Sequence, residues 1–203
     1  MNWLAHVFLS EPSVEFRLGN LLADIVKGSA REGMNEDFLR GIRRHQAIDS
    51  FTDSHPVVRR SRARVESVQR RFSGIVVDVF YDYLLATSWD RYSSEPLASF
   101  TAAFYADIET ARVVLPQEAQ ATVERMIRRD MLGSYTQVEA VRHALRRVSM
   151  RLAARWERPF ELEVSVVDLQ NHHDAFAADF AEFFPQLQAY VGQLGSDASR
   201  RGA

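Results

Sequence analysis

The segment 41–55, GIRRHQAIDSFTDSH, places ionisable side chains where the spacing of a helix calls for apolar ones. One face of the predicted helix follows the repeat of a stripe that faces a protein core. The stripe consists of Phe38, Ile42, His45, Asp49 and Thr52. A buried imidazole or carboxylate is costly unless it is paired, protonated or bound to a metal. His45 and Asp49, one turn apart, are therefore candidates for a metal or phosphate site.

A second segment, SGIVVDVFYDYLLATSW at 73–89, is apolar nearly all round, which is typical of a buried helix. Asp78 and Asp82 nevertheless lie one turn apart on one face of this predicted helix. Two carboxylates on a buried face require cations, either arginine side chains or a metal. An internal Asp–Arg network and a metal site explain the pattern equally well.

Two further segments hold polar groups whose pattern alone favours an ordinary structural role. His6 lies in the apolar segment MNWLAHVF, and a single histidine there is more often structural than a ligand. Asn20, Asp24 and Lys27 share one helical stripe with two arginines, as on the solvated side of an amphipathic helix.

The composition excludes several classes of protein. The chain has 203 residues, a net charge of −2 and no cysteine, so disulfides, thiolate catalysis and zinc–thiolate sites are excluded. A metal would be held by His, Asp and Glu, which favours Mg, Mn, Fe or a catalytic Zn. The net charge argues against a general nucleic-acid binder, and no apolar run approaches the roughly 20 residues of a membrane span. The N-terminus lacks the basic start of a signal peptide, so we expect a cytoplasmic protein.

Common catalytic loops are absent from the sequence. It contains no G-x-S-x-G, no G-x-x-x-x-G-K-[ST], no G-x-G-x-x-G and no H-E-x-x-H. The chemistry that remains is that of His and Asp on several helices. Such a set suits the binding of a divalent cation and the activation of a water for attack on phosphorus.

The segment 59–71, RRSRARVESVQRR, is rich in arginine. A solvated helical face explains it. An alternative is a docking surface for an acidic partner, with Arg60, Arg62 and Arg64 as the contacts.

The periodicity predicts an all-α, single-domain helical bundle, with no alternating strands and no hairpin signal. We expect one domain over 1–195 and a disordered tail over 196–203. The predicted helices span 2–9, 14–28, 36–53, 57–72, 75–90, 96–113, 117–131, 136–156 and 166–192, the last with a possible break at Pro185.

Several segments, in order and at similar spacing, resemble the acyl carrier protein phosphodiesterase family, also called ACP hydrolyases. These are MNWLAH, GNLLADIVKG, GIRRHQAIDSFTD, the RR at 70–71 and DVFYDYLL, with a looser match at 171–185. The resemblance implies a fold related to the HD-domain phosphohydrolases and a divalent metal, often Mn, with Mg or Fe as alternatives. It implies hydrolysis of 4′-phosphopantetheine from the serine of holo acyl carrier protein, an acidic partner of fatty acid biosynthesis.

The resemblance also implies roles for individual residues. The residues expected around the metal and phosphate are His6, Asp24, His45, Asp49, Asp78 and Asp82. Asp24, His45, Asp49 and Asp78 are the expected catalytic ligands, and Lys27 is expected to hold the phosphate.

Three further positions complete this expected site. Arg71 is expected to hold the phosphate as a fork, and Asn20 is expected to contact the substrate. The family commonly has a histidine where this chain has Tyr83, so no general acid is expected there.

Two alternatives stay open on the sequence alone. The chain could hydrolyse another phosphoester, such as a nucleotide, because HD-like folds accept many substrates. It could also be a non-catalytic helical protein that binds an acidic partner. The sequence does not decide the oligomeric state.

Overall fold

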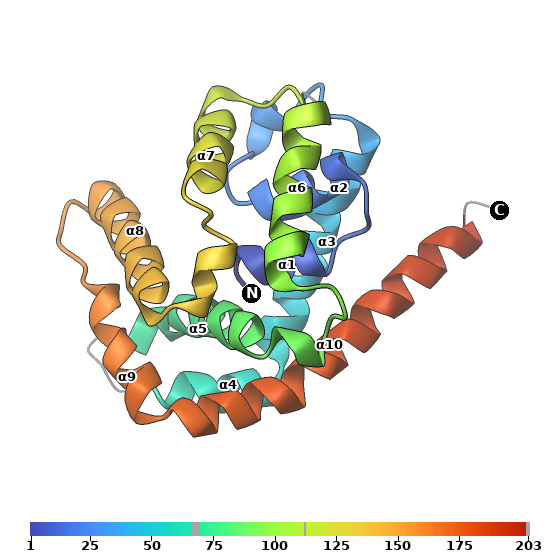
Figure 1. Ribbon diagram of the computed structural model, residues 1–203. Coiled ribbons are helices and arrows are strands. Elements are labelled where there is room, and N and C mark those ends of the chain that lie inside the picture. Colours follow the sequence, from blue (N-terminus) through green and yellow to red (C-terminus); the bar gives the residue numbers. More distant parts are fainter. Residues whose placement is uncertain (66–69, 112, 202–203) are drawn as a thin grey trace. The chain divides into compact units, whose positions relative to one another are not determined.

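The computed structural model describes residues 1–65, 70–111 and 113–201. In these ranges the chain forms helices joined by loops and contains no strand, which confirms the all-α prediction (Figure 1). The α-helices are α1 (Trp3–Phe8), α2 (Val14–Leu22), α3 (Glu36–Ser54), α4 (Pro56–Ala63), α5 (Ser73–Thr87), α6 (Leu97–Ala111), α7 (Gln117–Arg128), α8 (Val138–Trp156), α9 (Val166–Asn171) and α10 (His173–Arg201). Short 3-10 helices lie at Gly28–Arg31, Arg70–Phe72, Trp89–Arg91, Gly133–Thr136 and Leu162–Ser165.

Three of the predicted helices differ most from those of the structure. The helix predicted over 14–28 ends at Leu22, and a turn leads to Gly28, whose φ of +56° ends any helical run. The helix predicted over 57–72 ends at Ala63, while residues 66–69 of that prediction lie outside the described residues.

The last predicted helix, 166–192, breaks earlier than expected. The break falls at His172, with φ −120° and ψ 23°, and Pro185 lies inside α10. The final turns of α10, at 196–201, fall in the segment that the sequence assigns to a disordered tail.

The chain divides into two compact units. The single domain over 1–195 stays a prediction. The amino-terminal unit contains Asn2–Ala47 and Asp82–Ala140. The carboxy-terminal unit contains Met1, Ile48–Tyr81 and Val141–Ala203. Helices α3 and α5 each contribute residues to both units.

In the carboxy-terminal unit, α4 lies beside α10 (Figure 1). Asp179 of α10 is buried and accepts hydrogen bonds from Ser61 at 2.7 Å and from Arg60 Nε at 2.6 Å. Arg64 also donates to this carboxylate. Because a buried carboxylate is costly without partners, these bonds explain why the apolar α10 face tolerates Asp179.

In the amino-terminal unit, α2 and α3 approach each other through two glycines. A Cβ on Gly41 would lie 2.1 Å from the carbonyl oxygen of Phe16. A Cβ on Gly19 would lie 2.0 Å from the carbonyl oxygen of Phe38. Only glycine fits at either position, so the two helix backbones come into direct contact here.

No helix in the described ranges is both long enough and apolar enough to cross a membrane.

Candidate active site

Asp82 of α5 holds the first turn of α1. Its fully buried carboxylate accepts the backbone N–H groups of Leu4 at 2.7 Å and Ala5 at 3.1 Å. A carboxylate is well suited to this end of a helix because it satisfies N–H groups that have no partner within the helix. Asp82, an expected metal ligand, therefore acts in the structure as the residue that fixes α1, and with it His6.

Asn20 of α2 contacts both histidines of the site and is completely buried. Its side-chain Oδ1 lies 2.8 Å from Nδ1 of His6. Its main-chain oxygen lies 2.7 Å from Nδ1 of His45. The two imidazoles stack with ring centroids 4.1 Å apart and an angle of 17° between their planes. Asn20, which is expected to contact the substrate, has no exposed surface in the structure and contacts the two imidazoles.

Asp24 and Lys27 follow α2 on the exposed edge of this histidine pair. Asp24 Oδ2 lies 3.8 Å from Nε2 of His45. Its Oδ1 lies 3.1 Å from the Lys27 ammonium. Both side chains are largely exposed, at 72% for Asp24 and 63% for Lys27. The carboxylate is therefore close to a ring nitrogen and still open to a ligand from solvent.

In the carboxy-terminal unit, Asp49 and Asp78 share one cationic group. The α-amino nitrogen of Met1 lies 3.3 Å from Asp49 Oδ1 and 3.2 Å from Asp78 Oδ1. Asp78 Oδ1 is buried and makes no hydrogen bond of good geometry in the described part of the chain. Burial raises the pKa of the Asp78 carboxyl above its ordinary value, an effect that the Met1 ammonium only partly offsets.

Three candidate ligands come together without Asp78. His6, His45 and Asp49 each offer one ligand atom, and these atoms lie within 4.8 Å of one another. Asp49 follows His45 by one turn of the unbroken helix α3, so their spacing is a property of that helix. Two imidazole nitrogens and a carboxylate oxygen form a donor set for Mn, Fe or Zn.

The donor chemistry and the surrounding charges fit a divalent cation. Asp49 and Asp78 already accommodate one positive group, the Met1 ammonium, within 3.3 Å. The Asp78 oxygen without a hydrogen bond offers a further ligand to a cation. The geometry therefore permits a metal-assisted hydrolysis, in which a cation and basic side chains balance the charge of a phosphoester.

The three arginines expected to dock an acidic partner are all engaged in ion pairs. Arg60 and Arg64 contact Asp179, as described for the carboxy-terminal unit, and Arg60 also contacts Glu182 at 2.6 Å. Arg62 pairs with Asp53. Arg62 also packs 3.1 Å from where a Cβ on Gly74 would be. Burial raises the pKa of Asp78, and the Arg62 charge partly opposes that rise.

Arg71, the other expected phosphate contact, lies against aromatic rings. Its guanidinium carbon is 5.0 Å from the ring centre of Phe72 and 5.7 Å from that of Trp156. Such stacking leaves the edge of a guanidinium open to hydrogen bonding.

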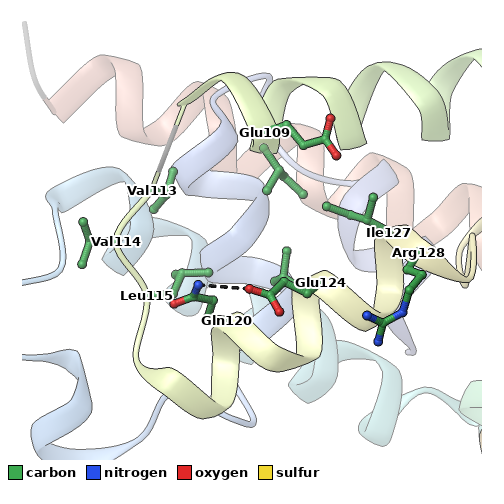
Figure 2. Close-up of a pocket in the computed structure, with 10 residues that line it drawn as sticks. Glu109, Val113, Val114, Leu115, Gln120, Glu124, Ile127 and Arg128 are labelled. Atoms are coloured by element: carbon green, nitrogen blue, oxygen red, sulfur yellow. Dashed lines mark hydrogen bonds between the residues drawn. The ribbon is translucent and has the colours of Figure 1, made fainter.

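A pocket of about 670 Å³ lies elsewhere in the amino-terminal unit, between α6, α7 and the loop that joins them (Figure 2). Its lining is mainly aliphatic, with Leu115 and Ile127 among the apolar side chains. Gln120 and Glu124 are joined by a hydrogen bond of 3.0 Å on one wall. None of the residues that line it is a histidine or an aspartate, so it does not share the chemistry of the His6–His45 pair.

Sequence reasoning missed the residues that orient the histidine pair. Ser10 accepts a hydrogen bond of 2.8 Å from the Asn20 amide and donates one of 2.8 Å to the His6 carbonyl. The signal for the close helix crossing was available, because Gly19 and Gly41 lie inside helical patterns where glycine is unfavourable.

The chain is similar to proteins of one known family. The family described as "Acyl carrier protein phosphodiesterase" matches residues 1–187. A protein named acyl carrier protein phosphodiesterase from Photorhabdus laumondii is 30% identical over 188 residues, 92% of this chain and 93% of the relative. Proteins of the same name from two Escherichia coli strains, CFT073 and K12/DH10B, are each 32% identical. The first match covers 92% of this chain and 95% of the relative, the second 95% and 98%.

No solved structure matches the chain, so the expected relation to the HD-domain fold stays a prediction. The family match spans most of the chain and includes every residue of the His6–His45 site. On this evidence the chain belongs to the acyl carrier protein phosphodiesterase family, whose members are hydrolases that act on a phosphodiester.

Proposed function

We propose that this chain is a metal-dependent phosphodiesterase that hydrolyses 4′-phosphopantetheine from the serine of holo acyl carrier protein. The products are the apo carrier protein and free 4′-phosphopantetheine. The observation that carries the proposal is the stacked pair of buried imidazoles, His6 and His45, with the partly exposed Asp49 one turn along α3, a donor set for a divalent cation. The names of the relatives support the carrier protein as substrate.

The proposed metal ligands are drawn from the expected set. They are His6, Asp24, His45, Asp49 and Asp78, with manganese as the expected ion and Mg or Fe as alternatives. When bound, the ion lowers the pKa of a water ligand and offsets phosphate charge. Asp82 is left out of this set because its oxygens accept two backbone N–H groups, and we propose that it positions α1.

Basic side chains would hold the phosphate. Lys27 is kept beside Asp24 by the contact of 3.1 Å, so its ammonium stands at the exposed edge of the site. Of the three arginines expected to dock an acidic partner, Arg62 is the one whose charge acts on Asp78. We propose it as a second phosphate contact. Arg71 stays the predicted fork on the phosphate or its neighbouring groups.

The acidic carrier protein would meet arginines that already have partners. Arg60 and Glu182 are about half exposed, at 47% and 51%, so an incoming carboxylate can replace Glu182 at little cost. Asp179 is 2% exposed and needs the cations that it has. We therefore propose that docking uses the outer edge of this cluster and leaves the Asp179 network intact.

Intact mass spectrometry of holo acyl carrier protein tests the function directly. The carrier protein is incubated with this chain and Mn²⁺, and in parallel with EDTA. We expect loss of the phosphopantetheine mass only in the Mn²⁺ sample. Equal loss in EDTA would contradict metal dependence, and an unchanged carrier mass with bound metal would contradict the carrier protein as substrate.

Asp49→Asn is the matching variant. We expect it to lower turnover by about 100-fold or more, since loss of a ligand weakens both metal binding and water activation. Asp37→Asn is its control, because Asp37 lies on the same helix, loses the same charge and pairs only with Arg40 among the described ion pairs. Equal turnover in the two variants would contradict the role of Asp49.

A further inference from the structure

Asn20 of α2 lies between two other helices of the amino-terminal unit, α1, which contains His6, and α3, which contains His45. It lies in α2 with no exposed surface. Its side chain bonds to α1 and to Ser10, and its main-chain oxygen bonds to His45 of α3. A polar residue in this position affects both imidazoles at once.

The orientation of the Asn20 amide follows from its neighbours. The carbonyl oxygen of His6, 2.8 Å from Nδ2, can only accept a hydrogen bond. The NH₂ group must therefore point there, and Oδ1 must face Nδ1 of the His6 ring at 2.8 Å. Because Oδ1 can only accept, Nδ1 of His6 must carry the proton.

The tautomer of His45 follows from the same residue by a different route. Nδ1 of His45 lies 2.7 Å from the main-chain oxygen of Asn20, which is also only an acceptor. Nδ1 of His45 therefore donates as well. In a neutral imidazole with Nδ1 protonated, the lone pair lies on Nε2.

The stacking of the two rings determines on which side their Nε2 atoms lie. Each Nδ1 atom lies within 2.8 Å of an oxygen of Asn20, and the angle between the ring planes is 17°. The two Nε2 atoms therefore lie on the side of the rings away from Asn20. For His45 this is the side of Asp24, whose carboxylate is 3.8 Å from Nε2.

We infer that Asn20 is a positioning residue that fixes His6 and His45 as a pair of Nε2 ligands, His6 through its side-chain amide and His45 through its main-chain carbonyl. Ligating histidines commonly have their second nitrogen held by a carboxylate or a carbonyl, which sets ring orientation and tautomer. The inference deepens the proposed function, on which its catalytic meaning rests. The hydrogen bonds themselves belong to the metal-free protein.

The tautomers can be read by long-range ¹H–¹⁵N NMR of the full chain with ¹⁵N-labelled histidine, without metal or substrate. The signals are assigned from the spectra of His6→Gln and His45→Gln. We expect both residues in the Nδ1–H form in the unmodified chain. An Nε2–H form at either residue of the unmodified chain would overturn the inference, independently of the results for the Asn20 and Ser10 variants.

Asn20→Ala separates the two routes within one protein. His6 loses its acceptor, so its spectrum should become that of a mixture of tautomers. His45 should stay in the Nδ1–H form, because the main-chain carbonyl remains. The affinity for Mn²⁺, measured by titration calorimetry, should fall by about 10- to 100-fold. An unchanged His6 spectrum with unchanged Mn²⁺ affinity would overturn the inference.

Two further variants control for the loss of a buried amide. Ser10→Ala removes one bond to the Asn20 amide and should change neither the His6 spectrum nor the affinity. Asn20→Asp keeps the shape and the acceptor at Oδ1 but loses the NH₂ group that faces the His6 carbonyl, and Nδ1 of His6 should still carry a proton. This variant decides the question if Asn20→Ala does not fold, and an Nε2–H form there would count against the inference.

The outcomes separate this inference from the proposed function. Failure of the chain to bind Mn²⁺ or to change the carrier protein would contradict the function and leave the tautomers as measured. Metal binding and carrier hydrolysis with a mixed His6 tautomer in the unmodified chain would contradict the role of Asn20 alone.

Discussion

Asp78 shows what a carboxylate costs inside an apolar helix. Its charged and polar neighbours are the Met1 ammonium, Asp49 and Arg62. Burial nevertheless raises the pKa of Asp78 above its ordinary value of 3.8. A carboxyl with the higher pKa in the folded state favours folding while it is protonated, and this contribution is lost as the pH rises through the folded-state pKa. At neutral pH Asp78 therefore lowers the stability of the metal-free protein.

Asp78→Asn should raise the melting temperature of the metal-free protein at pH 7 by a few degrees, since about 1 kcal/mol corresponds to roughly 2–4 °C in a chain of this size. The gain should disappear below pH 4, where Asp78 itself is protonated. Scanning calorimetry in EDTA across pH 3.5–8 measures this difference. A variant less stable than the parent at pH 7 would show that ion pairing outweighs burial at Asp78.

Individual residues of the site could be predicted to different extents. His45 and Asp49 follow from helical periodicity alone, because they interrupt an apolar stripe on a single helix. His6 and Asp24 follow only from the family resemblance, since their own segments look like ordinary structural helices. The role of Asp82 could not be predicted from the sequence. Its carboxylate caps α1 through contacts with Leu4 and Ala5, which lie 78 and 77 positions earlier in the chain.

At the scale of helices, the contact between α2 and α3 sets the geometry of the histidine pair. The backbones touch at Gly19 and Gly41, and this contact brings the Asn20 carbonyl to within 2.7 Å of the His45 ring. A side chain at either glycine would push the helices apart. The distance between α2 and α3 is therefore part of the site.

Gly41→Ala should destabilise the protein by about 1–3 kcal/mol, because the added methyl meets backbone rather than a movable side chain. Gly192→Ala is the matched control, since a Cβ there meets nothing within 4 Å in α10. The control should be neutral or stabilising by up to about 1 kcal/mol. Urea unfolding of both variants measures the two changes, and equal free energies of unfolding would show that α2 and α3 can separate without cost.

The presence of most α-helices could be predicted from the sequence, whereas the residues at which several of them end could not. Periodicity gave α3 within one residue at its C-terminal end because Pro56 follows it closely. The sequence predicts one helix over 166–192 with a possible break at Pro185, yet the chain breaks at His172, between α9 and α10. A proline need not end a helix where the carbonyl that it leaves without a partner can be satisfied otherwise. Local sequence does not contain that information.

At the scale of the whole molecule, a bound metal should stabilise the folded chain. A ligand at 100 times its dissociation constant adds about 2.7 kcal/mol, which corresponds to roughly 5–10 °C in the melting temperature. We expect Mn²⁺ to produce such a shift in the parent chain, measured by calorimetry against EDTA. The double variant His6→Gln/His45→Gln should lose it. An equal shift in both proteins would place the binding of Mn²⁺ at other residues.

The division of the chain has a practical consequence for genetic dissection. Each compact unit is assembled from stretches that alternate along the sequence, and α3 and α5 are divided between the units in mid-helix. No single truncation point separates the two units, because a fragment that keeps the segments of one unit also carries a segment of the other: 1–140 retains 48–81, and 48–203 retains 82–140. Expression of either half of the gene should therefore give an unfolded, protease-sensitive fragment, and surface-loop insertions are the better route to tagging the interior of the protein.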